Sequence, residues 1–283
     1  MKAPPFSYIR AETVEGVIEC LQKYGDDAAV LAGGQSLMAS LNMRLSAPRV
    51  LIDINNVNSL SGIALDGNHL RIGAMVRQIE VEQSPLVAQH APLISMAMPY
   101  VAHPAVRNRG TIGGSIAFAD PAAELPACIV TLQANLIAQG SKGERKIPAI
   151  EFFNGLYETA LTSDEVLIAI ELPVATGRQK FSFKELARRH GDYAIIGVCA
   201  STEWSGTSLS DVRLVYFNAG DRPVVATKAG AALEGVLSTE ILESALGHLA
   251  EDIDPPSDLN AGPSMRLHLA KVLTKRIFQE WMS

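Results

Sequence analysis

Two short glycine-containing segments are the parts of this sequence best suited to binding a ligand. Segment 32–36 reads AGGQS and segment 111–115 reads TIGGS, so each places an adjacent glycine pair before or beside a hydroxyl residue. Adjacent glycines allow successive backbone N–H groups to point into one concavity, a nest that can hold phosphate oxygens. One such pair alone is most often a tight turn. Two of them could clasp a dinucleotide from opposite sides, so we expect a nest at each segment.

Other common site motifs are missing from the sequence. There is no GxGxxG between a strand and a helix and no GxxxxGK[ST], so neither a Rossmann site nor a P-loop is supported. The three cysteines, Cys20, Cys128 and Cys199, are widely separated, and His103 has no neighbouring ligand residues. A [2Fe–2S] cluster usually takes four cysteines, so we expect any such cluster on another chain and no metal site here.

Charge and composition narrow the functional class further. The net charge is −6 and the basic residues are scattered, which excludes the basic footprint of a nucleic-acid-binding protein. Hydrophobic residues make up 48% of the 283 residues, enough for a sizeable core. No apolar run reaches about 18 residues and the first residues do not resemble a leader, so we expect a cytoplasmic protein without a transmembrane segment.

The N-terminal part of the sequence alternates helical and strand-like patterns around the first glycine pair. Apolar residues at 14, 17, 18 and 21 lie between a cap at Thr13 and a stop at Gly25, which predicts an amphipathic helix. Strands are predicted at 29–32, 50–54 and 70–72, and the stretch 79–98 is helical with breaks at Pro85 and Pro92.

The rest of the sequence divides at a linker near residue 176. Asp120-Pro121 is expected to cap a helix that runs to Leu132, and 166–172 alternates like a strand. Beyond the linker, three strand-like runs (181–186, 195–204 and 209–217) precede helical patterns starting at 226, 239 and 265. We therefore expect an α+β protein with two domains, residues 1–175 and residues 176–283.

Several blocks, in order and at matching spacing, give the chain a resemblance to a known family. They are PPFSY, AGGQSL with NMRL, VLIDI, RNRGTIGGSIAFADPAAELPA, EFFNGLYETAL and FKELARRHGDYA, which together span nearly the whole chain. The chain resembles the FAD-binding medium subunit of the molybdenum hydroxylases, the family of xanthine dehydrogenase and aerobic carbon monoxide dehydrogenase. The carbon monoxide enzyme has His where Gln35 stands, which argues against carbon monoxide as substrate.

The resemblance implies a fold and a set of cofactor contacts. The fold would be a two-lobed FAD-binding domain of the vanillyl-alcohol oxidase (PCMH) type, followed by a smaller α+β domain with a three-stranded antiparallel sheet and helices. The two phosphate-binding segments of the family match Ala32, Gly33, Gly34, Gln35, Ser36, Thr111, Ile112, Gly113, Gly114 and Ser115.

Five further positions match family residues around the cofactor: Val101, Glu124, Leu161, Lys184 and Tyr193. Each has an ordinary structural alternative. Glu124 could be a surface carboxylate of a helix, Lys184 an exposed strand residue, and Tyr193 a core tyrosine with its hydroxyl satisfied. Asp120 is better explained as a helix cap than as a catalytic base. We expect no catalytic residue on this chain, only residues that bind FAD.

The resemblance also implies a role in a larger assembly. A large subunit with molybdopterin would hydroxylate the substrate, a small subunit would carry [2Fe–2S] clusters, and this chain's non-covalently bound FAD would pass electrons to an external acceptor, in a dimer of heterotrimers. One alternative is a self-sufficient FAD-dependent oxidase or dehydrogenase of the same fold. Another, a binding module that has lost its cofactor, is disfavoured by the two intact glycine segments.

Overall fold

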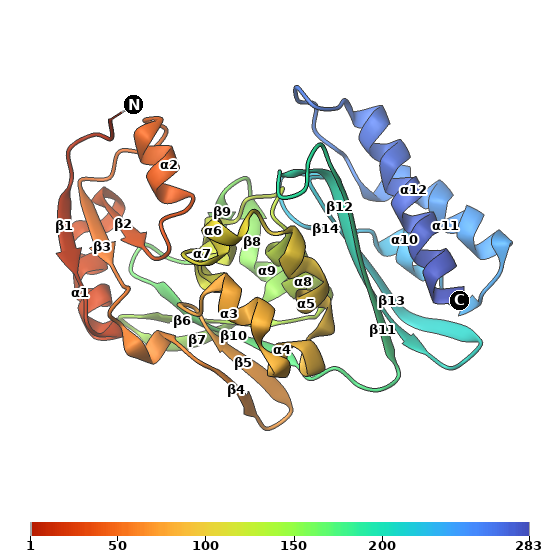
Figure 1. Ribbon diagram of the computed structural model, residues 1–283, viewed down its shortest axis with the longest axis horizontal. Helices are drawn as coiled ribbons and strands as arrows, with labels where there is room; N and C mark the ends of the chain where they lie inside the picture. The colour runs from red at the N-terminus through yellow and green to blue at the C-terminus, as the bar shows by residue number, and fades with distance from the viewer. Residues whose placement is uncertain (1, 283) are drawn as a thin grey trace.

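Three lobes follow one another along the chain in the computed structural model, which describes residues 2–282. A small N-terminal sheet lies at one side of the molecule, a central lobe of sheet and short helices lies in the middle, and a C-terminal sheet with long helices lies at the other side (Figure 1). No helix within residues 2–282 is both long and apolar enough to cross a membrane.

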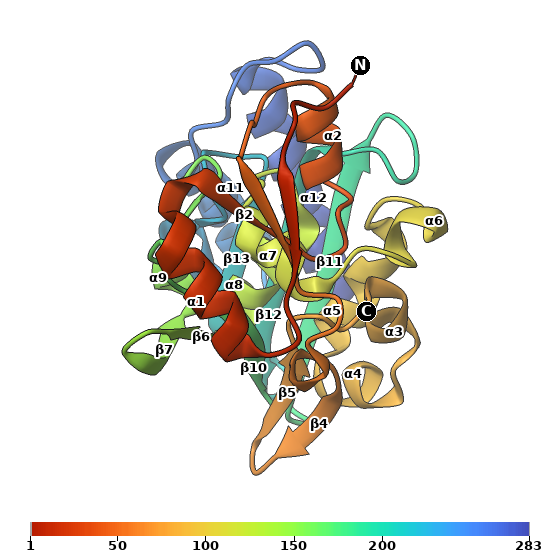
Figure 2. The same ribbon diagram turned by 90° about the vertical axis from the view of Figure 1, so that its left-hand side faces the viewer.

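The N-terminal lobe is a parallel sheet in the order β1-β3-β2, and it faces the viewer in Figure 2 with α1 beside it. Its strands and helices are β1 (Ser7–Arg10), α1 (Val14–Tyr24), β2 (Ala28–Leu31), α2 (Leu37–Asn42) and β3 (Val50–Asp53). The predicted first helix is confirmed: the Thr13 hydroxyl accepts a hydrogen bond from Gly16 N at 3.1 Å, and its apolar face is buried. Because β2 and β3 are parallel, their carboxyl ends meet at one edge, where the first glycine segment begins.

The central lobe is an antiparallel sheet in the order β4-β5-β10-β6-β7 with short helices packed on it. Its strands are β4 (Ile63–Asp66), β5 (His69–Gly73), β6 (Asn135–Gly140), β7 (Gly143–Pro148) and β10 (Val166–Pro173), with a separate pair, β8 (Phe153–Gly155) and β9 (Glu158–Thr159). Its helices are α3 (Gln78–Gln83), α4 (Pro85–His90), α5 (Pro92–Ala97), α6 (Pro104–Arg107), α7 (Ile112–Phe118), α8 (Glu124–Thr131) and α9 (Ala149–Phe152).

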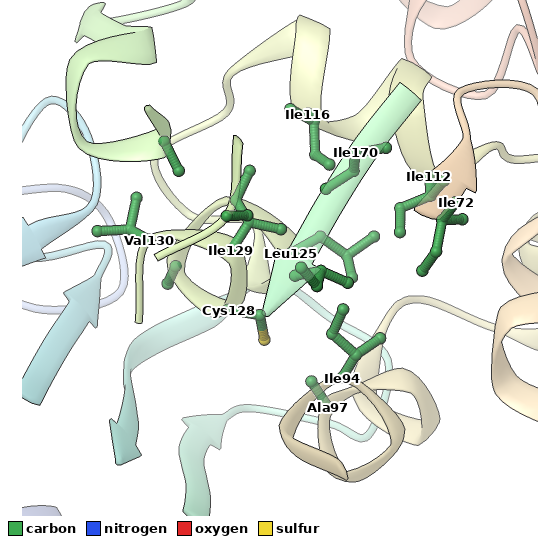
Figure 3. Close-up of a cluster of buried hydrophobic side chains, with 14 of the residues drawn as sticks. Ile72, Ile94, Ala97, Ile112, Ile116, Leu125, Cys128, Ile129, Val130 and Ile170 are labelled. Atoms are coloured by element: carbon green, nitrogen blue, oxygen red, sulfur yellow. The ribbon is translucent and has the colours of Figure 1, made fainter. Parts of the chain in front are cut away.

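The largest hydrophobic core lies between this sheet and its helices. Ile170 of β10 lies near Ile112 and Ile116 of α7 and Leu125 of α8 (Figure 3). These side chains are fully buried, so helices α7 and α8 are held firmly against the sheet. The second glycine segment is part of α7 and is therefore fixed by the core itself.

The C-terminal lobe is a twisted sheet in the order β11-β12-β13-β14, with β15 pairing to β13. Its elements are β11 (Gln179–Ala187), β12 (Ala194–Trp204), β13 (Ser208–Phe217), β14 (Val224–Val225), α10 (Thr227–Ala232), β15 (Gly235–Val236), α11 (Thr239–Asp252) and α12 (Pro263–Met282). The three long antiparallel strands confirm the predicted sheet, and β14 and β15 are short additions at its edges. One face packs on α5 and α8, and the other on α12 and α10.

The predicted start of one helix is wrong. Helix α8 begins at Glu124 rather than at Pro121, and its N-cap position is Ala123. The carboxylate of Asp120 instead accepts a hydrogen bond from Ala122 N at 2.9 Å, which closes a local turn before the helix. Asp120 therefore caps a turn and does not cap α8.

Candidate functional site

A cavity of about 530 Å³ opens where the three lobes meet. The carboxyl ends of β2 and β3, the start of α7 and the segment 191–193 before β12 contribute to its walls. Its volume lies within the range of roughly 300–1,000 Å³ typical of ligand sites. The sequence-predicted residues that line it are Ala32, Gly33, Gly34, Gln35, Ser36, Val101, Thr111, Gly113, Gly114, Ser115, Glu124, Leu161 and Tyr193.

The first glycine segment has the geometry of a nest. Gly34 has a φ of +72°, a backbone conformation that side chains rarely adopt. Within residues 2–282, the backbone N–H groups of 33–36 donate to no protein acceptor. The segment therefore presents a row of unpaired donors at the wall of the cavity, suited to anionic oxygens.

The second glycine segment is not a nest, and the prediction of two nests is wrong here. It forms the start of α7, where the Thr111 hydroxyl accepts from Gly114 N at 3.1 Å. Gly113 N donates to Ala74 O at 2.9 Å and Ser115 N to Thr111 O at 3.1 Å, so these N–H groups are used inside the protein. A Cβ on Gly113 would lie 2.5 Å from the Ala74 Cβ. Glycine is thus needed here for close packing, and the side chains of Thr111 and Ser115 are the polar groups left for a ligand.

The first glycine segment contacts the backbone directly before the second one. A Cβ on Gly33 would lie 2.3 Å from the carbonyl oxygen of Arg109 and 2.8 Å from the Cα of Gly110. A Cβ on Gly114 would lie 3.6 Å from the Cβ of Ala32. The N-terminal lobe and the central lobe therefore meet at a point where only glycine fits.

No lysine, arginine or histidine is among the described residues that line the cavity. Its ionisable lining groups are carboxyls and a phenol, and its other polar groups are backbone N–H groups, hydroxyls and amides. Gln78 is 5% exposed, lines the cavity, and its Oε1 has no hydrogen-bond partner within residues 2–282. Such an orphaned buried acceptor suits a ligand that brings its own donor.

Glu124, at the start of α8, is buried, so the alternative that it is a surface carboxylate of this helix is wrong. It is 6% exposed, and burial raises its pKa to about 8, with a smaller contribution from the nearby Glu185 and Asp120 carboxyls. Burial also raises the pKa of Glu185 on β11 to about 7. Near neutral pH the Glu124 carboxyl is therefore mainly protonated and can donate a hydrogen bond into the cavity.

Tyr193 and Asp120 face each other at the rim of the cavity. Burial raises the pKa of Asp120, partly offset by hydrogen bonds from Ala122 N and the Tyr193 hydroxyl. Tyr193 is 62% exposed, so it is not a core tyrosine. The same two residues line a second, open depression of about 1370 Å³ between segment 150–157 of the central lobe and the C-terminal lobe.

Two sequence-predicted residues lie outside the cavity lining. Ile112 is fully buried in the central core, and the Lys184 ammonium forms an ion pair with Glu280 of α12 at 2.7 Å. Arg107, shortly before the second glycine segment, is 6% exposed and pairs with Glu82 at 2.8 Å. It therefore supports this loop from within and is not available to a ligand.

Other lining residues carry no local sequence signal. Gln78, Val106, Glu165 and Leu167 reach the cavity only because α3, α6 and β10 are brought together by the central sheet and its helices. A buried glutamine after a strand is unremarkable in sequence. Only the orphaned Oε1 of Gln78 marks it, and that is visible only in three dimensions.

Two family models together account for nearly the whole chain. Residues 4–175 match the "FAD binding domain in molybdopterin dehydrogenase", and residues 181–281 match the "CO dehydrogenase flavoprotein C-terminal domain". The chain belongs to the FAD-binding family of the molybdopterin dehydrogenases. This confirms the resemblance inferred from the sequence blocks and shows that the chain carries an FAD-binding domain.

Named relatives agree in sequence and in fold. Subunit alpha of the 6-hydroxypseudooxynicotine dehydrogenase complex of Paenarthrobacter nicotinovorans is 34% identical, covering 98% of this chain and 94% of that protein. Carbon monoxide dehydrogenase of Hydrogenophaga pseudoflava superposes with a TM-score of 0.95 at 34% identity, covering 98% of this chain and 96% of the other. Quinoline 2-oxidoreductase of Pseudomonas putida 86 superposes with a TM-score of 0.93 at 36% identity, covering 99% and 98%.

The raised pKa of Glu124 predicts a specific pH dependence of stability. The folded chain binds this proton up to a pKa of about 8, whereas an unfolded glutamate releases it near 4.5. The contribution of Glu124 to the free energy of unfolding should therefore be complete below pH 4.5. It should fall as the pH rises towards 8, by at most about 1.4 kcal/mol per pH unit. Urea unfolding of cofactor-free Glu124→Gln should show a smaller decline over this range. The exposed Glu144→Gln variant is the control and should keep the wild-type slope; an unchanged slope in Glu124→Gln would contradict the assignment.

Proposed function

We propose that this chain binds one FAD in the cavity between its lobes and serves as the electron-transfer subunit of a molybdenum hydroxylase. A small partner would supply electrons from [2Fe–2S] clusters, a large partner would hold molybdopterin, and an external acceptor would take the electrons, in a cytoplasmic dimer of heterotrimers. The observation that carries the proposal is the row of unpaired backbone donors at 33–36 within an FAD-binding domain.

The residues present fit such a cofactor. A dinucleotide pyrophosphate needs hydrogen-bond donors, and in the absence of lining lysine or arginine these come from segment 33–36 and the hydroxyls of Thr111 and Ser115. Gln78 offers an acceptor for a cofactor hydroxyl or amine. Val101 and Leu161 supply apolar lining, and we propose that they, Glu124 and Tyr193 surround the flavin. Ile112 and Lys184 keep structural roles.

Bound FAD would supply the redox chemistry, and the protein's own task is to bind, orient and shield it. A protonated Glu124 can donate a hydrogen bond without adding negative charge beside an anionic cofactor. Tyr193, exposed at the rim and facing Asp120, can cover the opening of the cavity. These residues account for binding without requiring any catalytic acid or base on this chain.

The need for partners follows from the composition of the chain. Its three cysteines are too few for a four-cysteine cluster, and the two close ones, Cys128 and Cys199, are buried with their sulfurs 3.6 Å apart. Relatives named as subunits or medium chains of dehydrogenases support an assembly of the same type here. We also propose a domain boundary near residue 176, supported by the end of β10 at Pro173 and the start of β11 at Gln179.

Co-purification tests the assembly. The tagged chain, expressed from its native host, should bring down one larger and one smaller subunit together with FAD, molybdenum and iron. Substrate added to this complex should bleach the flavin absorbance at 450 nm only when the small subunit is present. A chain that purifies alone and oxidises an organic substrate at full rate would instead establish the self-sufficient oxidase.

Replacing Gly34 with valine tests the position of the phosphate site. Gly34 has a φ of +72°, and a Cβ there would lie 3.2 Å from Leu31 Cδ1 and 3.3 Å from Met38 Cγ, so Gly34→Val should distort the nest. We expect at least about a tenfold loss of FAD affinity, the effect of one or more lost hydrogen bonds. Gly114→Val, which would place a Cβ 2.7 Å from the Thr111 hydroxyl, should also lose FAD.

Gly67→Val is the matched control for backbone strain. Gly67 has a φ of +57° in the β4–β5 hairpin, with nothing within 4 Å of its Cβ position. It should lower stability without changing FAD affinity. Stoichiometric flavin in both Gly34→Val and Gly114→Val would show that the phosphates bind elsewhere.

The FAD should be held non-covalently. The nucleophilic side chains nearest the glycine segments, His103 and Cys128, are both absent from the described cavity lining, and Cys128 is fully buried in α8. Acid precipitation should therefore release FAD into the supernatant and leave a pellet without flavin fluorescence. A fluorescent pellet would show that one of these side chains is attached to the ring.

A further inference from the structure

Two polar side chains outside the described cavity lining connect the glycine segments to one another. Asn55 follows β3 in the N-terminal lobe, and Arg77 precedes α3 in the central lobe. Asn55 Nδ2 donates to Ala32 O at 2.9 Å, at the start of the first segment. Arg77 Nη1 donates to Arg109 O at 2.5 Å, two residues before the second segment.

The same two side chains bond to each other. Arg77 Nη2 donates to Asn55 Oδ1 at 2.6 Å, so a continuous chain of hydrogen bonds runs from Ala32 through Asn55 and Arg77 to Arg109. The planar guanidinium suits this task because its fork of donors can bind two acceptors at once. We call this chain of bonds the Asn55–Arg77 bridge.

The N-terminal end of the bridge is itself held in place. Asp53 Oδ1 accepts from the backbone N–H of Asn55 at 2.8 Å and from its Nδ2 at 2.5 Å, and Tyr8 donates its hydroxyl to the other carboxylate oxygen. These bonds close a local turn at 53–55. They hold the Asn55 side chain in the orientation in which its Nδ2 donates to Ala32 and its Oδ1 accepts from Arg77. The bridge is therefore pre-organised from the β1–β3 side.

The two carbonyls held by the bridge lie where the backbones of the N-terminal and central lobes are in close contact. The carbonyl of Arg109 that Arg77 binds is the atom lying 2.3 Å from the Cβ position of Gly33. Ala32, bound by Asn55, is the residue before Gly33, and its Cβ would lie 3.6 Å from a Cβ on Gly114. A small shift of either carbonyl would therefore move the unpaired N–H groups of 33–36 relative to Thr111 and Ser115.

We propose that Asn55 and Arg77 are positioning residues for the dinucleotide, because their bridge fixes the first glycine segment against the second across the two lobes. Neither residue is expected to touch the cofactor. Their effect passes through the carbonyls of Ala32 and Arg109. This inference rests on the proposed function, since it assumes that FAD occupies the cavity.

Titration of the cofactor-free full chain with FAD, monitored by flavin fluorescence, tests the bridge. Asn55→Ala and Arg77→Gln should each raise the Kd about tenfold, as expected for loss of a hydrogen bond worth about 1.4 kcal/mol. The double variant should be little worse than either single one, because both changes break the same bridge. Arg77→Lys should recover part of the loss, since an ammonium can still bind one of the two acceptors.

Arg71→Gln is the matched control. Arg71 is a half-buried arginine on β5 whose Nη1 pairs with Glu171 at 2.7 Å, away from both glycine segments. This variant should keep the wild-type Kd even if it lowers the unfolding temperature. Circular dichroism of each cofactor-free variant shows whether it is folded, and for a variant that is not, the Arg77→Lys titration provides the measurement.

The outcomes separate the two proposals. If the wild-type chain binds no FAD, the proposed function fails before the bridge is tested. If the wild type binds FAD and the folded Asn55→Ala and Arg77→Gln variants bind it equally well, the bridge is not a positioning device. Additive losses in the double variant would likewise overturn it, because the two residues would then act separately.

Discussion

The close approach of Gly33 to the backbone of Arg109 and Gly110 is the constraint on which the site depends. At this point the N-terminal and central lobes touch through main-chain atoms, and a Cβ on Gly33 would lie 2.3 Å from a carbonyl oxygen. The parallel pairing of β2 with β3 delivers Gly33 to the contact, and the core around Ile112 and Ile170 fixes the opposite side. At this contact the two lobes meet through backbone atoms, whereas below it they share a hydrophobic core in which α1 packs on β6 and β10.

The two glycine pairs look alike in sequence but have different structural roles. Gly34 uses the left-handed backbone conformation and leaves neighbouring N–H groups unpaired, whereas Gly113 and Gly114 are helical and their N–H groups are satisfied within the protein. The first pair can bind an anion directly. The second allows α7 to pack tightly on Ala74 and so supports the first. The shared sequence pattern predicts two equivalent nests, whereas both segments line the cavity and only the first leaves its N–H groups unpaired within the described residues.

The features that can be predicted from the sequence are those determined by residues close together in the chain. The cap at Thr13, the prolines that begin α4 and α5, and the long strands of the C-terminal sheet follow from local pattern, and all are present. The predicted start of α8 is wrong because the Asp120 carboxylate accepts a hydrogen bond from Ala122 N in a local turn. Any Asp-Pro pair can form such a turn instead of capping a helix. The pairing of Lys184 with Glu280 joins residues far apart in the chain, so no spacing rule could reveal it.

Among the described residues, three of the four carboxyls that line the cavity are neutralised by burial or by an arginine outside it. An anionic dinucleotide would be repelled by the lining carboxyls, which are Asp120, Glu124, Glu165 and Asp192, and no lining lysine or arginine within the described residues offsets them. Glu165 is instead neutralised from outside the cavity by Arg145 at 2.6 Å, and burial favours the protonated forms of Asp120 and Glu124. The C-terminal sheet is essential to this arrangement, because it packs against α8, and the carboxyl of its Glu185 adds to the upward shift of the Glu124 pKa. The C-terminal lobe, which has no glycine segment, thus helps set the charge of the cavity lining.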